Sequence, residues 1–173
     1  ESPTDPLITS AYSTYKGMRI VNDPFFPCTV SFICSAQMRV ERIFQMQQRI
    51  RRFYGNVTEF KGKKYYEYPG PEILSELNEN ELRKLGLGYR APYVIETAEM
   101  LKYDPNGDTY FMENYEESRH RLTELKGVGE KVADCICLFS GGHLEAVPLD
   151  TWIRSLIKVH YPDCEHKRYG DMS

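Results

Sequence analysis

Hydrophobic and polar positions along the first part of the chain predict short helices. From residue 39 to 53, apolar residues recur with a period close to 3.6 and arginines lie between them, which predicts an amphipathic, arginine-rich helix. The apolar stretch 30–34 follows Pro24 and Pro27, which favour helix starts, and predicts a buried helix. Another short helix is expected over residues 7–16, with a glycine just beyond it as a stop.

The rest of the chain continues the helical pattern between turn signals. Asn78, with an acid three residues later, has the spacing of a capping box and predicts a helix that runs to Lys84. Helices are also expected at about 91–103 and about 115–125, followed by two final helices that glycines and a proline separate. Residues 55–70, rich in glycine, proline and aromatic residues, predict a turn or small β-hairpin, so the fold is expected to be mainly α.

Length and composition are those of one globular domain. The 173 residues are 41% hydrophobic and 27% charged. The formal net charge is −3, so the whole molecule offers no attraction to nucleic acid, and any DNA-binding surface must be a local cluster. No apolar run reaches the roughly 18 residues that a membrane helix needs, and the chain opens on no basic and apolar leader, which favours an intracellular protein without a membrane partner.

Two glycines, Gly127 and Gly129, lie between two predicted helices within residues 125–135. A backbone that turns through glycine conformations leaves N–H groups open at the start of the next helix, where they suit a phosphate, and the helix dipole favours the anion further. Lys131 lies in the first turn of that helix, where the dipole disfavours an ammonium and favours the neutral, nucleophilic amine. The alternatives are a tight helical hairpin without a ligand and a solvated surface lysine.

A carboxylate follows nineteen residues after Lys131. Asp150 ends Val147-Pro148-Leu149-Asp150 and precedes an apolar helix, so we expect it to be the N-cap of that helix. A carboxylate held rigidly beside an amine can also stabilise positive charge that develops on a sugar. Capping alone is the alternative.

These motifs together resemble the helix-hairpin-helix, Gly-Pro-Asp superfamily of DNA glycosylases, and within it the 8-oxoguanine DNA glycosylase family. The resemblance spans roughly residues 17–160. It rests on the hairpin segment 127–135 and the aspartate segment 147–150, and upstream on three further motifs: Phe32-Ile33-Cys34-Ser35, Arg42-Ile43 and residues 82–90. It implies that residues 1–173 form a two-lobed, mainly α glycosylase core with the helix-hairpin-helix at about 115–140 and at most a small β-hairpin.

The resemblance implies a bifunctional enzyme of base-excision repair, a DNA glycosylase with AP lyase activity. In the family, the lysine that matches Lys131 attacks the sugar C1′, expels the oxidised purine and forms a Schiff base, and β-elimination then nicks the strand. The aspartate that matches Asp150 assists at the sugar and caps its helix. The implied partner is double-stranded DNA with 8-oxoguanine opposite cytosine. The alternatives are a glycosylase for another lesion and a non-catalytic helix-hairpin-helix DNA-binding module.

Several residues match family positions that contact DNA or the damaged base. Tyr89 matches a wedging tyrosine, and Arg42 and Arg90 match arginines that contact the unpaired cytosine, whose acceptors suit guanidinium donors. Gln37 stands where eukaryotic members have an asparagine that enters the helix. Cys135 matches a cysteine that lines the base pocket. The alternatives are a core tyrosine, solvated arginines and a buried free cysteine, although the Gly-Leu-Gly before Tyr89 and Arg90 predicts that both lie in an exposed turn.

The hairpin departs from the family at one position. Lys126 replaces the usual proline and is counted with the two glycines among the DNA-contacting residues. The backbone carbonyls of Thr123, Leu125 and Val128 match positions that hold a monovalent or similar structural cation. No other cofactor is implied.

Other departures concern the family branch and the extent of the chain. Trp152 replaces a histidine that contacts a phosphate in eukaryotic members, which favours a prokaryotic or archaeal cytoplasmic protein. Family members usually add an N-terminal β-domain and a helix after the core that clamps the damaged base; residues 1–173 contain neither, so either the chain is a fragment or the lid is supplied otherwise. We expect a monomer. The iron–sulfur members of the superfamily have cysteines clustered near the C-terminus, and this spacing is lacking here. We therefore expect neither an iron–sulfur cluster nor a zinc site from Cys28, Cys34, Cys135, Cys137 and Cys164.

Overall fold

The computed structural model describes residues 5–112 and 114–162. The elements follow one another in the order α1 (Pro6–Thr14), α2 (Phe25–Ser35), α3 (Val40–Tyr54), β1 (Val57–Phe60), β2 (Lys63–Tyr66), α4 (Pro71–Ser75), α5 (Glu79–Lys84), the 3₁₀ turn η1 (Gly88–Arg90), α6 (Ala91–Met100), α7 (Tyr115–Leu122), α8 (Glu130–Phe139) and α9 (Thr151–His160). Within the described residues, the strands form one antiparallel pair.

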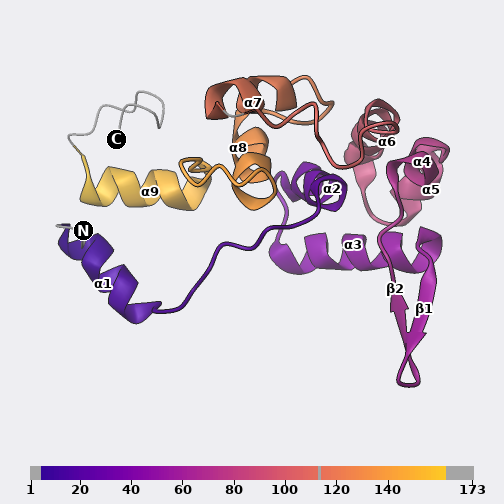
Figure 1. The fold of residues 1–173 in the computed structure, drawn as a ribbon, viewed down its shortest axis with the longest axis horizontal. Coiled ribbons are helices and arrows are strands. Elements are labelled where there is room, and N and C mark those ends of the chain that lie inside the picture. The colour runs from indigo at the N-terminus through magenta and orange to yellow at the C-terminus, as the bar shows by residue number, and fades with distance from the viewer. Residues whose placement is uncertain (1–4, 113, 163–173) are drawn as a thin grey trace.

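The helices form two groups on either side of α2 (Figure 1). In one group α4 and α5 pack against α6, and in the other α7 packs against α8. Helix α2 contacts α3, α6 and α8, so it joins the two groups. Its buried residues Val30 and Ile33 share one core with Leu74, Val94 and Ile136. The expected mainly α, two-lobed fold with a small hairpin is confirmed.

Local signals in the sequence placed several helix starts correctly. Asn78 and Glu81 form the expected capping box at α5. Asp150 is the N-cap of α9, where its Oδ1 accepts the N–H of Ile153 at 2.8 Å. The helix α4 was missed, because Pro71 at its first turn follows a proline and a glycine that favour a turn.

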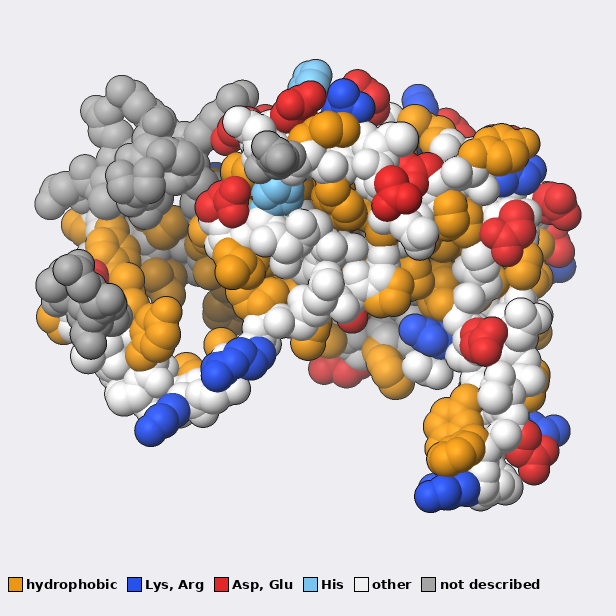
Figure 2. All heavy atoms as spheres, in the orientation of Figure 1, with side chains coloured by type: hydrophobic (Ala, Val, Ile, Leu, Met, Phe, Trp, Pro, Cys, Tyr) orange, Lys and Arg blue, Asp and Glu red, His pale blue; other side chains and the backbone are white. Residues whose placement is uncertain are grey.

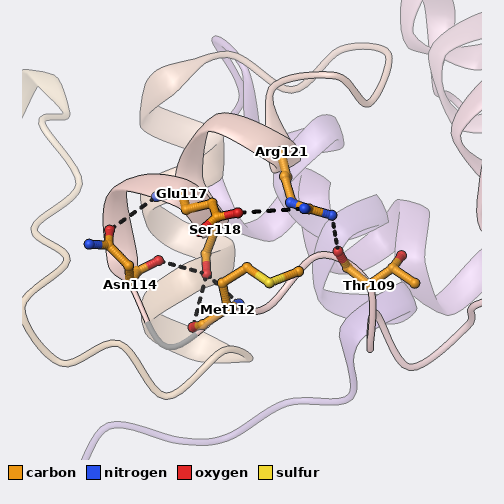
Figure 3. Close-up of polar contacts among 6 residues, drawn as sticks. All are labelled: Thr109, Met112, Asn114, Glu117, Ser118 and Arg121. Carbon is orange, nitrogen blue, oxygen red and sulfur yellow. Dashed lines mark hydrogen bonds and ion pairs between the residues drawn. The ribbon is translucent and has the colours of Figure 1, made fainter.

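The loop before α7 is fixed to that helix by several hydrogen bonds (Figure 3). Asn114 caps α7 by accepting the N–H of Glu117 at 3.2 Å. The hydroxyl of Ser118 accepts the N–H of Met112 at 2.7 Å, and Arg121 donates to the carbonyl of Thr109 at 3.1 Å. The loop is therefore fixed to both the first and the last turn of α7, the first helix of the hairpin element.

The chain ends of the described region lie near each other. Helices α1 and α9 occupy the same end of the molecule in Figure 1, and Tyr161 donates a hydrogen bond to Asp5 at 2.8 Å. No residue of α1 is buried, and Trp152 on α9 is 81% exposed. Within the described residues, no helix is long and apolar enough to cross a membrane.

The cysteines of the described residues are free thiols. Cys28, Cys34, Cys135 and Cys137 are buried and unbonded, while Cys164 lies outside the described residues. Across 5–112 and 114–162, no three His, Cys, Asp or Glu side chains come together as metal ligands. The absence of an iron–sulfur cluster and of a zinc site stays a prediction.

Candidate catalytic and DNA-binding site

The turn between α7 and α8 depends on glycine. Gly127 has a φ of +78°, and a Cβ there would lie 2.9 Å from the Cβ of Tyr93. Gly129 is the N-cap of α8; a Cβ there would meet nothing within 4 Å, and no side chain caps the helix. The first-turn N–H groups of α8 are therefore uncapped by side chains beside open space, as a phosphate requires.

The backbone carbonyls of this turn face different partners. The carbonyl of Lys126 accepts the hydroxyl of Thr97 at 2.9 Å, which ties the turn to α6, while the Lys126 side chain is exposed. The carbonyl of Leu125 accepts the N–H of Val128 at 3.1 Å. Among the described residues, no hydrogen bond reaches the carbonyls of Thr123 and Val128. These free carbonyl oxygens are suitable ligands for a hard cation.

Lys131 lies where α8 faces α2. Its Nζ is 5.5 Å from the centroid of the Phe32 ring, and it hydrogen-bonds the thiol of Cys135 one turn later on the same face of α8. Burial raises the pKa of the Cys135 thiol, the ammonium of Lys131 lowers it, and the carboxylates of Asp134 and Asp150 raise it. Lys131, Cys135 and Asp150 are therefore close enough to share one electrostatic environment, while the roles expected for them in catalysis and in the base pocket stay predictions.

A small pocket opens beside Lys131. Its wall comes from α7 with Arg119, from α8 with Glu130, and from Leu149 and Arg154 at the start of α9, so it lies where these three helices meet. Arg154 donates to the carbonyl of Leu149 at 3.3 Å, next to the capping residue Asp150. The half-buried lysine thus lines a pocket whose wall also contains Leu149, the neighbour of the N-cap residue Asp150.

A buried ion pair holds α7 against α8, and the sequence analysis missed it. Asp134 is 2% exposed, and its Oδ1 accepts the hydroxyl of Tyr115 at 2.7 Å and Nε of Arg119 at 2.6 Å. Arg119 also pairs with Glu130 at 3.1 Å. Burial and the hydrogen bond to the carboxylate raise the pKa of the Tyr115 phenol. The sequence held one signal for it: Asp134 lies four residues after Glu130 on the same helix face, and Arg119 lies on the preceding helix.

The predicted tyrosine and arginine of η1 differ sharply in exposure. Tyr89 is 52% exposed, as expected for a side chain in an exposed turn, and is not a core tyrosine. Arg90 is 4% exposed, so the expectation that it shares this exposed turn was wrong. Its guanidinium carbon lies 4.3 Å from the centroid of the Tyr89 ring, and one terminal nitrogen donates to the carbonyl of Ala36. Its Nε is buried and has no hydrogen-bond partner among the described residues.

The Arg90–Ala36 hydrogen bond connects η1 to the turn between α2 and α3. Gln37 in that turn is exposed and has a left-handed φ of +51°. Arg42 is exposed in the first turn of α3 and lines a surface depression with Arg49 and Gly86, the latter just before η1. The structure therefore brings Gln37, Arg42, Tyr89 and Arg90 onto two adjoining turns.

This combination defines a helix-hairpin-helix protein of DNA repair: an open hairpin turn, a lysine in the following helix, an N-cap aspartate beside it, and a tyrosine and arginines on adjoining turns. Residues 30–172 match the family described as HhH-GPD superfamily base excision DNA repair protein, and the chain belongs to this family.

Similar proteins carry names from the same field. A protein of Methanothermobacter thermautotrophicus named "Probable N-glycosylase/DNA lyase" is 31% identical over 98% of this chain and 64% of its own length. The N-glycosylase/DNA lyase of Saccharomyces cerevisiae is 35% identical over 89% of this chain and 44% of its own length. The 8-oxoguanine glycosylase/lyase of Clostridium acetobutylicum, solved with double-stranded DNA containing cytosine opposite 8-oxoG, is 33% identical with a TM-score of 0.88, over 97% of this chain and 59% of that one. The chain thus spans less than two thirds of each of these relatives.

Proposed function

We propose that this protein is a bifunctional DNA glycosylase and AP lyase that removes 8-oxoguanine opposite cytosine from double-stranded DNA. The observation that carries the proposal is the position of Lys131, whose amine lies over the Phe32 ring and beside the Cys135 thiol, which the Asp150 N-cap also influences. The similarity to named N-glycosylase/DNA lyases supports it. We place the activity in the cytoplasm of a prokaryote or archaeon, as a monomer.

The proposed chemistry begins at the sugar. Once its ammonium has given up a proton, the amine of Lys131 attacks C1′, the bond from C1′ to the base breaks, and the base leaves with the electron pair and takes up a proton. Opening of the sugar ring then gives an imine between Nζ and C1′. Loss of a C2′ proton breaks the C3′–O bond and nicks the strand. Asp150, fixed by its hydrogen bond to the first turn of α9, stabilises the positive charge on the sugar.

The DNA contacts follow from the exposed turns. The target nucleotide must leave the stack before the amine can reach C1′. Tyr89, being exposed, fills the gap, while Gln37 and Arg42 contact the strand that keeps the cytosine. Arg90 supports the Tyr89 ring from the protein side, because its guanidinium lies against that ring. Its buried Nε, which has no hydrogen-bond partner among the described residues, keeps a donor available near the cytosine strand.

The hairpin grips the DNA backbone. We propose that Gly127 and Gly129 bring its backbone against a phosphate, with Lys126 adding charge at the rim. A structural cation would be held by the carbonyls of Thr123, Leu125 and Val128 and would fix the turn. It takes no part in the chemistry.

Borohydride trapping tests the assignment of Lys131. Reduction converts the imine into a stable covalent link, so wild-type protein and a duplex with 8-oxoguanine opposite cytosine should give a protein–DNA adduct. Lys131→Gln should abolish the adduct, whereas the control Lys102→Gln, on a lysine outside the site that pairs with Glu99, should retain it.

Two outcomes would contradict parts of the proposal. Equal trapping by wild type and Lys131→Gln would show that another amine attacks the sugar. Trapping on a duplex with an abasic site but not on the 8-oxoguanine duplex would keep the lysine chemistry and reject the lesion.

A further inference from the structure

Charge is distributed unevenly along the chain. Residues 39–66 contain eight Lys or Arg and two Asp or Glu, a net charge of +6, whereas the rest of the chain has a net charge of −9. This segment is α3 together with the β1–β2 hairpin. A protein that is acidic overall therefore concentrates its positive charge on two consecutive elements.

The positive charges of this segment are not neutralised by the part of the protein that the structure describes. No ion pair involves any of its eight cations among the described residues, although Arg83, Lys102 and Arg119 elsewhere are all ion-paired. Arg49 donates to the carbonyl of Leu85 at 3.1 Å, and Arg51 lies over the Tyr68 ring, so these two contact the body of the protein. Lys61 contacts only the hairpin itself, with its Nζ 5.3 Å from the centroid of the Phe60 ring. The exposed remainder is Arg39, Arg42, Arg52, Lys61, Lys63 and Lys64.

The hairpin presents lysines and aromatic rings at its free end. It extends away from the body of the molecule beyond α3, and basic side chains lie near its tip (Figures 1 and 2). Phe60 is paired with Lys63 across the strands, and Phe60 and Tyr65 are 59% and 51% exposed. Lys61 has a left-handed φ of +50° in the turn. A two-stranded ribbon of this kind fits the major groove of a duplex, and its lysines suit the flanking phosphates.

Helix α3 connects this tip to the proposed lesion site. Arg42, at its start, is one of the residues proposed to contact the strand opposite the lesion, and Arg52 is near its end. Fifteen residues of α-helix are about 22 Å long, which corresponds to roughly 6 base pairs of duplex. The hairpin therefore follows the end of α3 that is opposite to the Arg42 end.

We propose that α3 and the β1–β2 hairpin form a track that binds the duplex on one side of the lesion, with Lys61, Lys63 and Lys64 contacting phosphates beyond the reach of the helix-hairpin-helix. This inference rests on the proposed function only for the position of the lesion at the Arg42 end. The track compensates for the overall negative charge, because it provides attraction to DNA where the whole-molecule field does not.

The test compares a triple variant, Lys61→Gln/Lys63→Gln/Lys64→Gln, with a control that removes the same charge elsewhere, Lys16→Gln/Lys84→Gln/Lys158→Gln. All six lysines are exposed, so both variants should fold, which thermal melting checks. The dissociation constant for undamaged duplex is measured against salt concentration. Loss of three phosphate contacts should reduce the slope of log K against log salt by about 2 to 3, whereas the control should leave it near the wild-type value.

A second measurement locates the track. Duplexes carrying an abasic-site analogue with a flank of about 5 or about 15 base pairs on either side are bound to each protein. Wild type should prefer the long flank on one side only, and the hairpin variant should lose that preference. An unchanged salt slope or an unchanged flank preference in the hairpin variant would overturn the track. Borohydride trapping reports on the proposed function independently, since Lys131 is intact in both variants.

Discussion

Removal of the buried carboxylate between α7 and α8 gives the sharpest test of how the site is held. Asp134 is 2% exposed and accepts two short hydrogen bonds, from Tyr115 at 2.7 Å and Arg119 at 2.6 Å. Loss of one partner of a buried ion pair costs about 3–5 kcal/mol, because the other charge stays buried and unpaired. Arg119 keeps Glu130 at 3.1 Å, which places the expected loss for Asp134→Ala at the lower limit, about 3 kcal/mol.

The assay is thermal unfolding. For a protein of this size each kcal/mol shifts Tm by about 2–4 °C, so Asp134→Ala should melt roughly 6–12 °C below wild type. Glu130→Gln is the matched control: it removes the other, 67% exposed carboxylate that pairs with Arg119 and should cost only about 0–1 kcal/mol. If the two variants melt within about 2 °C of each other, the ion pair does not hold the helices together.

A double substitution separates burial from pairing. In Arg119→Met/Asp134→Leu both charges are replaced by apolar groups, which is often neutral or stabilising when the volumes match. The double variant should therefore be more stable than Asp134→Ala. Equal or lower stability would show that α7 and α8 need this ion pair for correct packing.

Two further predictions follow from the backbone and from a single carboxylate. Gly127→Ala should destabilise the protein by about 1–2 kcal/mol and weaken duplex binding, because the residue has a φ of +78° and the added Cβ would lie 2.9 Å from Tyr93. In the control Gly129→Ala the added Cβ meets nothing within 4 Å, so this variant should fold with little loss of stability. Similar melting temperatures for the two variants would contradict this. Burial opposes ionisation of Asp104, but hydrogen bonds from the turn that follows outweigh it and lower its pKa below the model-peptide value of 3.8. The stabilisation that the ionised Asp104 carboxylate gives the folded protein is therefore present above pH 3.8 and lost as the pH falls through the folded pKa. Asp104→Ala should cost about 1 kcal/mol of stability at pH 7 and progressively less in acid. A loss in Tm that stays the same at pH 7 and pH 3 would refute this.

Local sequence signals were sufficient for features that depend on neighbours in the chain. The caps of α5 and α9 follow from Asn78 and Asp150, since a capping side chain bonds an N–H only three residues away. Lys131 and Cys135 could be placed on one helix face for the same reason, because residues four apart are neighbours on a helix. The β-hairpin at residues 57–66 was also expected from its turn residues.

Other features could not be predicted because they join residues far apart in the chain. The ring beneath the Lys131 amine belongs to Phe32 on α2, which the sequence indicated as a buried residue and as part of a family match, but not as a neighbour of the lysine. Arg90 is buried because its guanidinium reaches the carbonyl of Ala36, 54 residues earlier. The residues around the short helix α4 locally favour a turn, but a helix forms there because it packs against α6.

By itself, the sequence determined the helical class, the glycine turn and the Asp150 cap, since each depends on residues within one or two helical turns. Only the tertiary structure decided which groups surround them: the ring of Phe32, the buried ion pair of Asp134 with Arg119, and the position of the basic hairpin beyond α3. The physical reason is that contacts between separate helices arise from packing of the whole core, which no local periodicity encodes.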